Sequence, residues 1–308
     1  MCQLCDARIS DALARQRTGV ARRTFLLATG AGLSGAAVGQ VDVGEASRLR
    51  TLIPAEELEQ AAAQEYQQLL AQARAKGVLA PPGNPSLQRL QNIVSRLIPP
   101  AVRWNERARN WRWEVNLINS PQVNAFVMPG GKIAVYTGLL EKLKLTEDEA
   151  AMVLAHEMAH ALREHARERI AKTQGTGIGL SVLGQILGLG QLGDVAANLG
   201  TQLLTLRFSR EDEIESDLVG LEIAARAGYD PDAAVSLWQK MNQAGGSSGP
   251  AFLSTHPSGP ERIRRLRENV PRVRGLYEQA RAGRAGQPAA TVAPSRSAPA
   301  SAGIPIIR

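Results

Sequence analysis

The segment Met152-Val153-Leu154-Ala155-His156-Glu157-Met158-Ala159-His160 combines an apolar run with two histidines and a glutamate. Residues four apart on an α-helix project from the same face, so His156 and His160 can reach one metal ion. Glu157 lies beside His156, where it can contact a metal-bound water as a general base. The apolar run predicts a buried helix, and burying these polar groups without partners would be costly. A zinc ion would satisfy all three groups; the alternative is two core histidines with ordinary hydrogen bonds.

The helix that carries these residues is predicted to run without a break from Thr146 to Ala171. Thr146 is a favourable N-cap residue. Three acids follow it in the first turn, where the helix dipole stabilises negative charge. These acids are Glu147, Asp148 and Glu149.

A third zinc ligand remains to be found, because catalytic zinc usually has three protein ligands and one open position. The metzincin pattern would need a histidine and a glycine at positions that are Ala166 and Arg163 here. His165 lies about 140° around the helix from His160, at ~100° per residue. We therefore expect His165 either to contact the ligand residues without binding the metal itself, or to lie at the surface.

A later acidic segment, from Ser209 to Asp217, offers the missing ligand. Glu213 and Asp217 are four residues apart and share a helix face. Glu213 can bind zinc, while Asp217 can accept the outer N–H of a ligand histidine and so fix its tautomer. The alternative is an acidic, solvated helix face.

The remaining pattern predicts an α+β, mainly helical fold with a small sheet beside the zinc-binding helix. Helices are expected over residues 54–76, 85–97, 199–227, 231–242 and 260–269, and strands over residues 111–118, 122–128 and 132–137. Pro99-Pro100 should stop the second helix. The glycine-rich, apolar residues 175–193 suit a mobile lid, a membrane-touching loop or an interrupted buried helix.

Residues 1–46 have the pattern of an export signal. Arg22-Arg23-Thr24-Phe25-Leu26 resembles the twin-arginine signal, and a mildly apolar run follows it. That run is shorter than the ~20 residues of a transmembrane helix. Cleavage after Gly39 or Ala46 would release the protein into the periplasm, whereas a retained segment would act as an inner-membrane anchor with peripheral membrane contact. The alternative is an ordinary amphipathic first helix.

Three further regions follow the signal. Residues 47–110 are expected to form an N-terminal helical part, residues 111–270 the zinc-binding core, and residues 271–308 a basic, Ala/Pro/Ser-rich disordered tail. The tail carries a net charge of +5 out of the total of +7. A nucleic-acid surface would need a basic face on the fold and stacking aromatics, but aromatics make up only 4% of the chain. We therefore expect no nucleic-acid partner.

The chain has two cysteines, Cys2 and Cys5, and both precede the predicted domain. No disulfide can therefore stabilise that domain. A structural zinc site needs four ligands, and no second cysteine pair exists. We interpret the pair as incidental, with metal or redox chemistry as the alternative.

The combined motifs resemble one family of zinc metallopeptidases, which includes HtpX, the LoiP and BepA proteases and the CAAX prenyl proteases. Four segments carry the resemblance: Asn124–Gly131, His156–His160, Ser209–Asp217, and Ser254-Thr255-His256-Pro257 followed by Glu261-Arg262-Ile263. Together they span most of residues 110–270. Ser216 departs from the family pattern, which usually has alanine before the aspartate.

The resemblance implies a gluzincin-type endopeptidase domain with one Zn²⁺ per chain, bound by His156, His160 and Glu213. Zinc would lower the pKa of its bound water towards ~7. Glu157 would take the proton and deliver it to the leaving amine. His256 is the candidate partner of the oxyanion; it could also bind the metal as a fourth ligand and switch the enzyme off, or be a structural loop histidine.

The predicted function is zinc-dependent hydrolysis of peptide bonds in protein or peptide substrates. The strand from Asn124 to Met128 would pair with an extended substrate, unless it is an ordinary core strand. Envelope quality control and misfolded envelope proteins as substrates follow from the resemblance alone. Two other functions remain open: a zinc-retaining chaperone or adaptor with weak proteolysis, against which the intact Glu157 argues, and a zinc amidase acting on a non-peptide substrate. The oligomeric state is left open.

Overall fold

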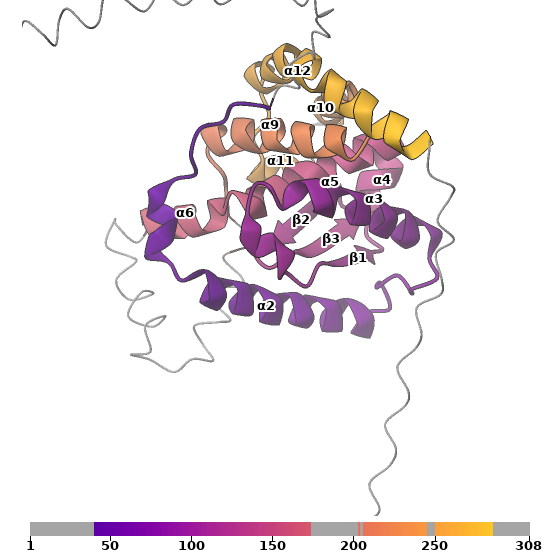
Figure 1. The fold of residues 1–308 in the computed structure, drawn as a ribbon. Coiled ribbons are helices and arrows are strands. Elements are labelled where there is room, and N and C mark those ends of the chain that lie inside the picture. The colour runs from indigo at the N-terminus through magenta and orange to yellow at the C-terminus, as the bar shows by residue number, and fades with distance from the viewer. Residues whose placement is uncertain (1–39, 174–202, 204–205, 245–249, 286–308) are drawn as a thin grey trace, which may run out of the picture. The chain divides into compact units, whose positions relative to one another are not determined.

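The computed structural model describes residues 40–173, 203, 206–244 and 250–285, all within one compact unit (Figure 1). Residues 1–39 of the predicted export signal, both cysteines and the glycine-rich residues 175–193 lie outside the described residues. Within the described part, no helix combines the length and the apolar character needed to span a membrane.

The architecture is α+β and mainly helical, as predicted. The elements are η1 (Arg48–Leu52), α2 (Ala55–Ala75), α3 (Pro85–Ala101), η2 (Glu106–Arg109), β1 (Glu114–Ile118), β2 (Ala125–Met128), β3 (Lys132–Tyr136), α4 (Thr137–Lys142), α5 (Glu147–Leu162), α6 (His165–Thr173), α9 (Arg210–Arg226), α10 (Ala233–Gln243), α11 (Ala251–Thr255) and α12 (Pro260–Ala285).

The three strands form one mixed sheet in the order β1-β3-β2. β1 runs parallel to β3, with Val115 opposite Ile133, and β2 runs antiparallel to β3, with Val127 opposite Ile133. The turn between β2 and β3 contains Gly130 and Gly131, whose φ angles are +80° and +77°. Glycine enters this left-handed region without strain. This turn joins β2 to β3, and the strand order leaves β2 at an edge of the sheet.

Helices cover both faces of the sheet (Figure 1). α2 lies on one face, and its buried side chains there include Ala62, Tyr66, Leu70 and Ala73. The other face carries α3 and α5, α9 packs on α5, and α12 packs on α9. Because α5 lies between the sheet and α9, its residues 149–162 are all buried.

The predicted single helix over residues 146–171 is in fact two helices, α5 and α6. The chain turns between them at Glu164, whose φ of +60° is in the left-handed region. A residue other than glycine pays about 1–2 kcal/mol for this conformation. The Glu164 carboxylate lies 3.3 Å from Arg50 and also pairs with Arg167. Contacts distant in sequence therefore stabilise a break that no local glycine or proline predicts.

The end of α3 also differs from the prediction. The helix continues through Pro99 and Pro100 and ends at Ala101. Proline fits a helical φ angle and costs mainly the missing N–H donors and local crowding. In this last turn, the burial of Leu97 and Ala101 in the core outweighs that cost.

α9 begins later than predicted. The described residues 206–209 are not helical, and Ser209 caps the helix by accepting a hydrogen bond from the Asp212 N–H at 3.1 Å. Such a cap stabilises a helix start by about 1 kcal/mol.

α12 extends beyond the predicted end of the core at residue 270. It runs through Pro271 to Ala285 and buries Val273 and Leu276. Residues 271–285, which we expected in a disordered tail, are therefore helical.

Candidate metal centre

α5 presents three polar side chains in the interior of the fold. A capping box starts the helix: Glu149 N–H donates to the Thr146 hydroxyl at 3.2 Å, and Thr146 N–H donates to the Glu149 carboxylate at 2.9 Å. Two turns later come His156, Glu157 and His160, each at most 3% exposed. The prediction of a buried helix carrying these residues is confirmed.

α9 supplies the carboxylate that meets the two imidazoles. The backbones of α5 and α9 approach closely at Gly220, where an added Cβ would lie 2.8 Å from the backbone nitrogen of His156. Only glycine fits such a crossing. The crossing brings Glu213, which is fully buried, within 3.4 Å of Nε2 of His160 and 3.5 Å of Nε2 of His156.

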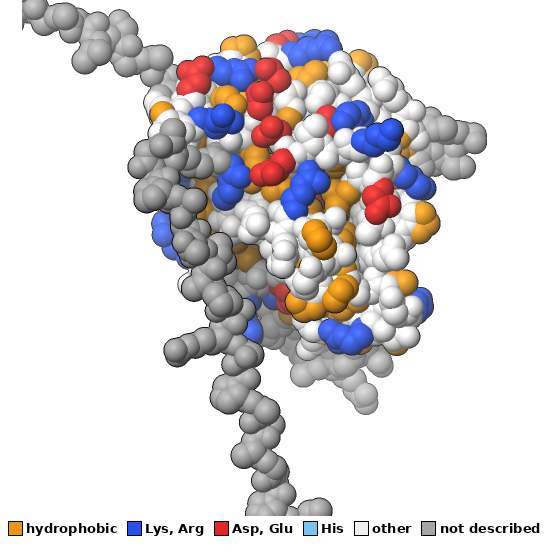
Figure 2. Space-filling view, turned by 90° about the vertical axis from the view of Figure 1, so that its right-hand side faces the viewer, with side chains coloured by type: hydrophobic (Ala, Val, Ile, Leu, Met, Phe, Trp, Pro, Cys, Tyr) orange, Lys and Arg blue, Asp and Glu red, His pale blue; other side chains and the backbone are white. Residues whose placement is uncertain are grey.

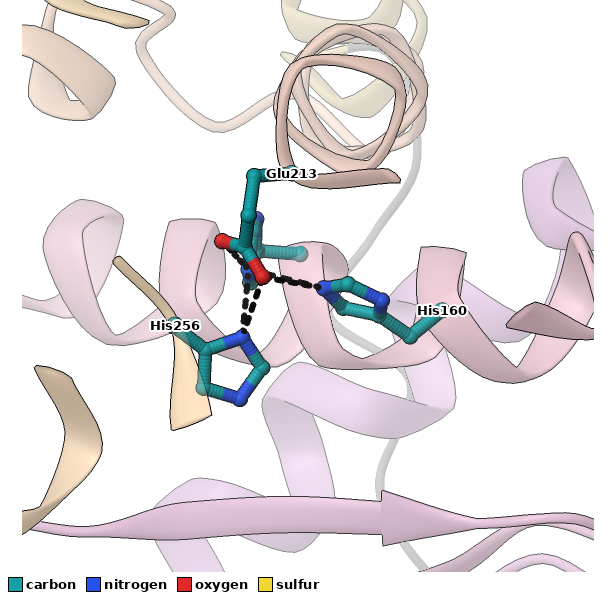
Figure 3. Close-up of side chains that lie close together, drawn as sticks. His160, Glu213 and His256 are labelled. Carbon is teal, nitrogen blue, oxygen red and sulfur yellow. Dashed lines mark hydrogen bonds and ion pairs between the residues drawn. The ribbon is translucent and has the colours of Figure 1, made fainter. Parts of the chain in front are cut away.

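His256 joins this group from the end of α11. Figure 3 shows the Glu213 carboxylate reaching from its helix towards the rings of His160 and His256. Nδ1 of His256 lies 2.9 Å from Oε1 of Glu213 and 3.4 Å from Nε2 of His156. The ring of Phe252 stacks on His256 at 4.4 Å between centroids and fixes its plane.

The donor set fits a zinc ion. The ligand atoms of His156, His160, Glu213 and His256 all lie within 4.8 Å of one another. Tetrahedral coordination with Zn–N bonds of about 2.0–2.1 Å places ligand atoms about 3.3–3.4 Å apart. The two histidine Nε2 atoms are 3.2 Å apart, close to that spacing.

The balance of buried charge also fits a divalent cation. Glu157, Glu213 and Asp217 are buried carboxylates, and Arg262 is the buried cation that contacts two of them. With neutral histidines this group carries a net negative charge, and buried charges require compensation.

Asp217 lies on the outer side of His156. Its Oδ1 is 3.0 Å from Nδ1 of His156, the ring nitrogen that faces away from the ligand cluster. Arg262 donates two hydrogen bonds to the Asp217 carboxylate, at 2.7 and 2.8 Å, and Trp238 Nε1–H donates a third at 3.1 Å. The Arg262 guanidinium also lies over the Trp238 ring at 3.6 Å. Asp217 is therefore held rigidly in position to orient His156.

The protonation of these groups reflects their burial and their neighbours. Burial holds the pKa of His160 well below its ordinary value. Burial acts in the same direction on His156, but the carboxylates of Asp217 and Glu213 overcome it and raise the pKa of His156 to about 9. Burial raises the pKa of Glu157, which favours proton uptake by this carboxylate.

The site is enclosed by the fold. All four histidines of the chain are buried, including His165 with 1% exposure, so the surface alternative for His165 is wrong. On the face shown in Figure 2 no histidine is visible, and basic and acidic side chains are interspersed.

Several contributors to the site escaped the sequence analysis. Arg262 was noted only as part of a motif, and Trp238, Phe252 and Gly220 gave no local signal. All four lie on helices other than the one with the His-Glu-x-x-His segment, and Gly220 shares α9 with Glu213. Their role depends on packing between elements, which the sequence pattern does not reveal.

β2 borders the site as an edge strand. Its neighbour within the sheet is β3, and it packs against α5 on one face. The residues that the structure describes place no further strand on its outer edge. This position agrees with the expectation of an added substrate strand but does not test it.

A buried helix with two histidines and a glutamate, joined by a glutamate from a second helix, defines a class of helical zinc metallopeptidase domains. The chain belongs to peptidase family M48, whose family model matches residues 86–270. The family expected from the sequence motifs is thereby confirmed.

Similar proteins occur in eukaryotes and bacteria. The chain is 38% identical over 213 residues to the mitochondrial metalloendopeptidase OMA1 of Schizosaccharomyces pombe, an alignment that covers 67% of this chain and 62% of that protein. It is 41% identical over 176 residues to the mitochondrial metalloendopeptidase OMA1 of Arabidopsis thaliana, covering 56% and 35%. It is 29% identical over 175 residues to the beta-barrel assembly-enhancing protease of Escherichia coli, covering 53% and 35%. The chain thus spans between about a third and three fifths of the length of these relatives.

Proposed function

We propose that the protein is a zinc-dependent endopeptidase whose metal is bound by His156, His160 and Glu213. The observation that carries the proposal is the convergence of these three buried donors from two helices, with Glu157 next to them in the sequence. Membership of peptidase family M48 supports it, as do relatives that are named metalloendopeptidases.

The residues around the metal have distinct roles in this proposal. A zinc ion bound there would act as a Lewis acid and lower the pKa of a water molecule. Glu157 takes a proton from the attacking water and transfers it to the leaving amine. Asp217 holds His156 so that Nε2 faces the metal, and Arg262 holds Asp217.

We propose that His256 occupies the fourth ligand position in this conformation and closes the site. Its Nδ1 lies among the ligand atoms, while its Nε2 lies 3.3 Å from Oε1 of Glu157. The ring therefore occupies the space next to the general base. A substrate carbonyl could enter only after the ring moves, and the displaced ring would then be available to stabilise the oxyanion.

We further propose that the substrates are proteins of the cell envelope and that twin-arginine export delivers the enzyme to the periplasm. The Arg22-Arg23 pattern before an apolar run supports export. The E. coli relative is a beta-barrel assembly-enhancing protease, which supports a role in envelope quality control. Substituting Arg22→Lys and Arg23→Lys together should leave the protein in the cytoplasmic fraction. Unchanged export would contradict the twin-arginine route.

The decisive experiment measures digestion of unfolded casein by zinc-loaded, chelated and zinc-reconstituted protein, beside the Glu157→Gln variant. Cleavage should require zinc and should be lost in Glu157→Gln, although that variant still binds zinc. If casein stays intact while aggregation is suppressed equally by both proteins, the chain is a chaperone or adaptor. If only a non-peptide amide is hydrolysed, it is a zinc amidase.

A further inference from the structure

His165, the first residue of α6, is a buried histidine outside the proposed ligand set. Its Nδ1 lies 3.0 Å from Nδ1 of His160 and 3.3 Å from the Ser216 hydroxyl. Its Nε2 lies 3.4 Å from Oε2 of Glu215. The ring therefore stands between a proposed ligand histidine and a carboxylate of α9.

His160, His165 and Glu215 form a row that leads outwards from the candidate metal site. The direction of the hydrogen bond between the two histidines follows from the position of the metal. Nε2 of His160 points at the ligand cluster, so a metal-competent His160 carries its proton on Nδ1. Nδ1 of His165 lies 3.0 Å from this Nδ1 and, with its lone pair, can accept a hydrogen bond from the His160 N–H. His165 then carries its own proton on Nε2, the atom that faces the Glu215 carboxylate. His165 thus accepts a hydrogen bond from His160, and its Nε2 faces the Glu215 carboxylate as an ion-pair contact at 3.4 Å.

The break between α5 and α6 creates this arrangement. On a continuous helix His165 would point about 140° away from His160. The left-handed turn at Glu164 brings the His165 ring back to His160 instead, with 5.0 Å between ring centroids. A backbone conformation that costs energy is thus used to place this histidine.

The outer end of the row is also fixed. Arg163, at the C-terminus of α5, pairs with Glu215. Arg163 also donates a hydrogen bond to the Gly44 carbonyl at 2.9 Å. The Glu215 side chain is 21% exposed, whereas that of His165 is 2% exposed, so the row leads from the surface into the site.

We propose that His165 is a positioning residue, which holds His160 in the tautomer that presents Nε2 to zinc, and that Glu215 orients His165. This inference rests on the ligand set proposed above. α9 then orients both ligand histidines: Asp217 contacts His156 directly, and Glu215 acts on His160 through His165. Outer partners of this kind commonly change metal affinity by about 10- to 100-fold.

The test measures the dissociation constant for Zn²⁺ on the full chain, by competition with a chromogenic chelator. His165→Phe keeps a flat ring but removes the acceptor, and it should weaken zinc binding by about 10- to 100-fold. His165→Asn places a carbonyl oxygen near the position of Nδ1 and should restore most of the affinity. The proposal therefore expects His165→Asn to bind zinc more tightly than His165→Phe. A role in packing alone would favour Phe, so tighter zinc binding by His165→Phe than by His165→Asn would overturn the proposal.

Glu215→Gln and Glu211→Gln form a matched pair on α9, because Glu211 is exposed and outside the row. Glu215→Gln should weaken zinc binding and reduce the rise in Tm on adding zinc; its Tm without zinc should also fall, because Arg163 loses its carboxylate partner. Glu211→Gln should behave like the parent. Since Glu215 is partly exposed, this pair tests the proposal even if His165→Phe fails to fold; equal zinc affinities in the pair would overturn it.

His160→Ala separates this inference from the ligand assignment. If His160→Ala binds zinc like the parent, the proposed ligand set is wrong, and the inference fails with it. If His160→Ala loses tight zinc binding while His165→Phe and Glu215→Gln keep it, the ligand set stands and the positioning role is wrong.

Discussion

Gly220 of α9 lies directly against the backbone of His156 of α5, with no room between them for a methyl group. This crossing sets the distance between the helix that carries the two histidines and the helix that carries Glu213. The geometry of the candidate metal centre therefore depends on Gly220, which has no side chain that could bind a metal ion.

Gly220→Ala should destabilise the fold by about 1–3 kcal/mol, because the added Cβ meets backbone atoms that cannot move aside independently. It should also weaken zinc binding, since Glu213 would be displaced from the histidines. Denaturant unfolding and chelator competition measure the two effects. Gly275→Ala in α12 is the control: a Cβ there meets nothing within 4 Å, so this variant should be neutral or slightly more stable. Equal stability of both variants would contradict the close-approach argument.

Arg262→Met should destabilise the protein by about 3–5 kcal/mol, because it leaves buried Asp217 and Glu213 without their cation. The loss should be larger without zinc than with it, since the metal supplies part of the missing positive charge. Thermal unfolding with and without zinc measures this difference. Arg264→Met, in an exposed ion pair with Glu261, should change Tm little. A loss as large in Arg264→Met would show that the helix, and not the buried pairing, is responsible.

His256→Ala should raise the affinity of the site for a zinc-binding hydroxamate inhibitor, since it removes the ring from the fourth position. Peptide cleavage reports the second role of this residue. Faster cleavage would mean that His256 acts mainly as a closing ligand, whereas slower cleavage with unchanged zinc content would mean that it stabilises the oxyanion. An unchanged hydroxamate affinity would refute the closed conformation.

Glu149→Gln should lower stability at neutral pH but not at strongly acidic pH. Burial opposes ionisation of Glu149, but hydrogen bonds from Lys240, Thr146 and Ser236 outweigh it and lower its pKa below the ordinary 4.5. A carboxyl with a lowered pKa in the folded state stabilises the fold above its unfolded pKa, and this contribution is lost as the pH falls through the folded value. Urea unfolding from pH 7 to pH 3 should show the parent and variant converging. Glu147→Gln, in a more exposed ion pair with Arg96, is the control and should change stability little.

Removal of residues 40–46 should destabilise the domain by about 2 kcal/mol or more. Val41 is buried in the core, and its N–H donates to the fully buried Glu222 carboxylate at 2.9 Å. Of the two expected cleavage positions, the one after Gly39 keeps this contact and the one after Ala46 removes it. A chain starting at residue 40 should therefore have a higher Tm than one starting at residue 47. Equal Tm values would show that the segment contributes nothing to the fold.

Local patterns predicted the helical content and the short strands well, because amphipathic periodicity and turn residues act within one element. Boundaries were wrong where contacts from elsewhere compete with the local preference. The prolines of α3 are tolerated because the last turn is packed into the core, and α12 continues past Pro271 because Val273 and Leu276 are buried. The largest error is the helix break at Glu164. The local sequence could not predict it, because Arg50, from a distant part of the chain, helps to stabilise it.

The sequence by itself determined that His156 and His160 share one face of a buried helix, because a spacing of four residues fixes their direction on any α-helix. It also singled out Glu213 and Asp217 as a pair on one helix face, while leaving their role open. Only the tertiary structure decided that this face meets the two histidines, that His256 reaches the same point and that His165 turns back towards His160. These outcomes depend on how the helices cross and on where one helix ends and the next begins. Both are set by packing between residues far apart in the sequence.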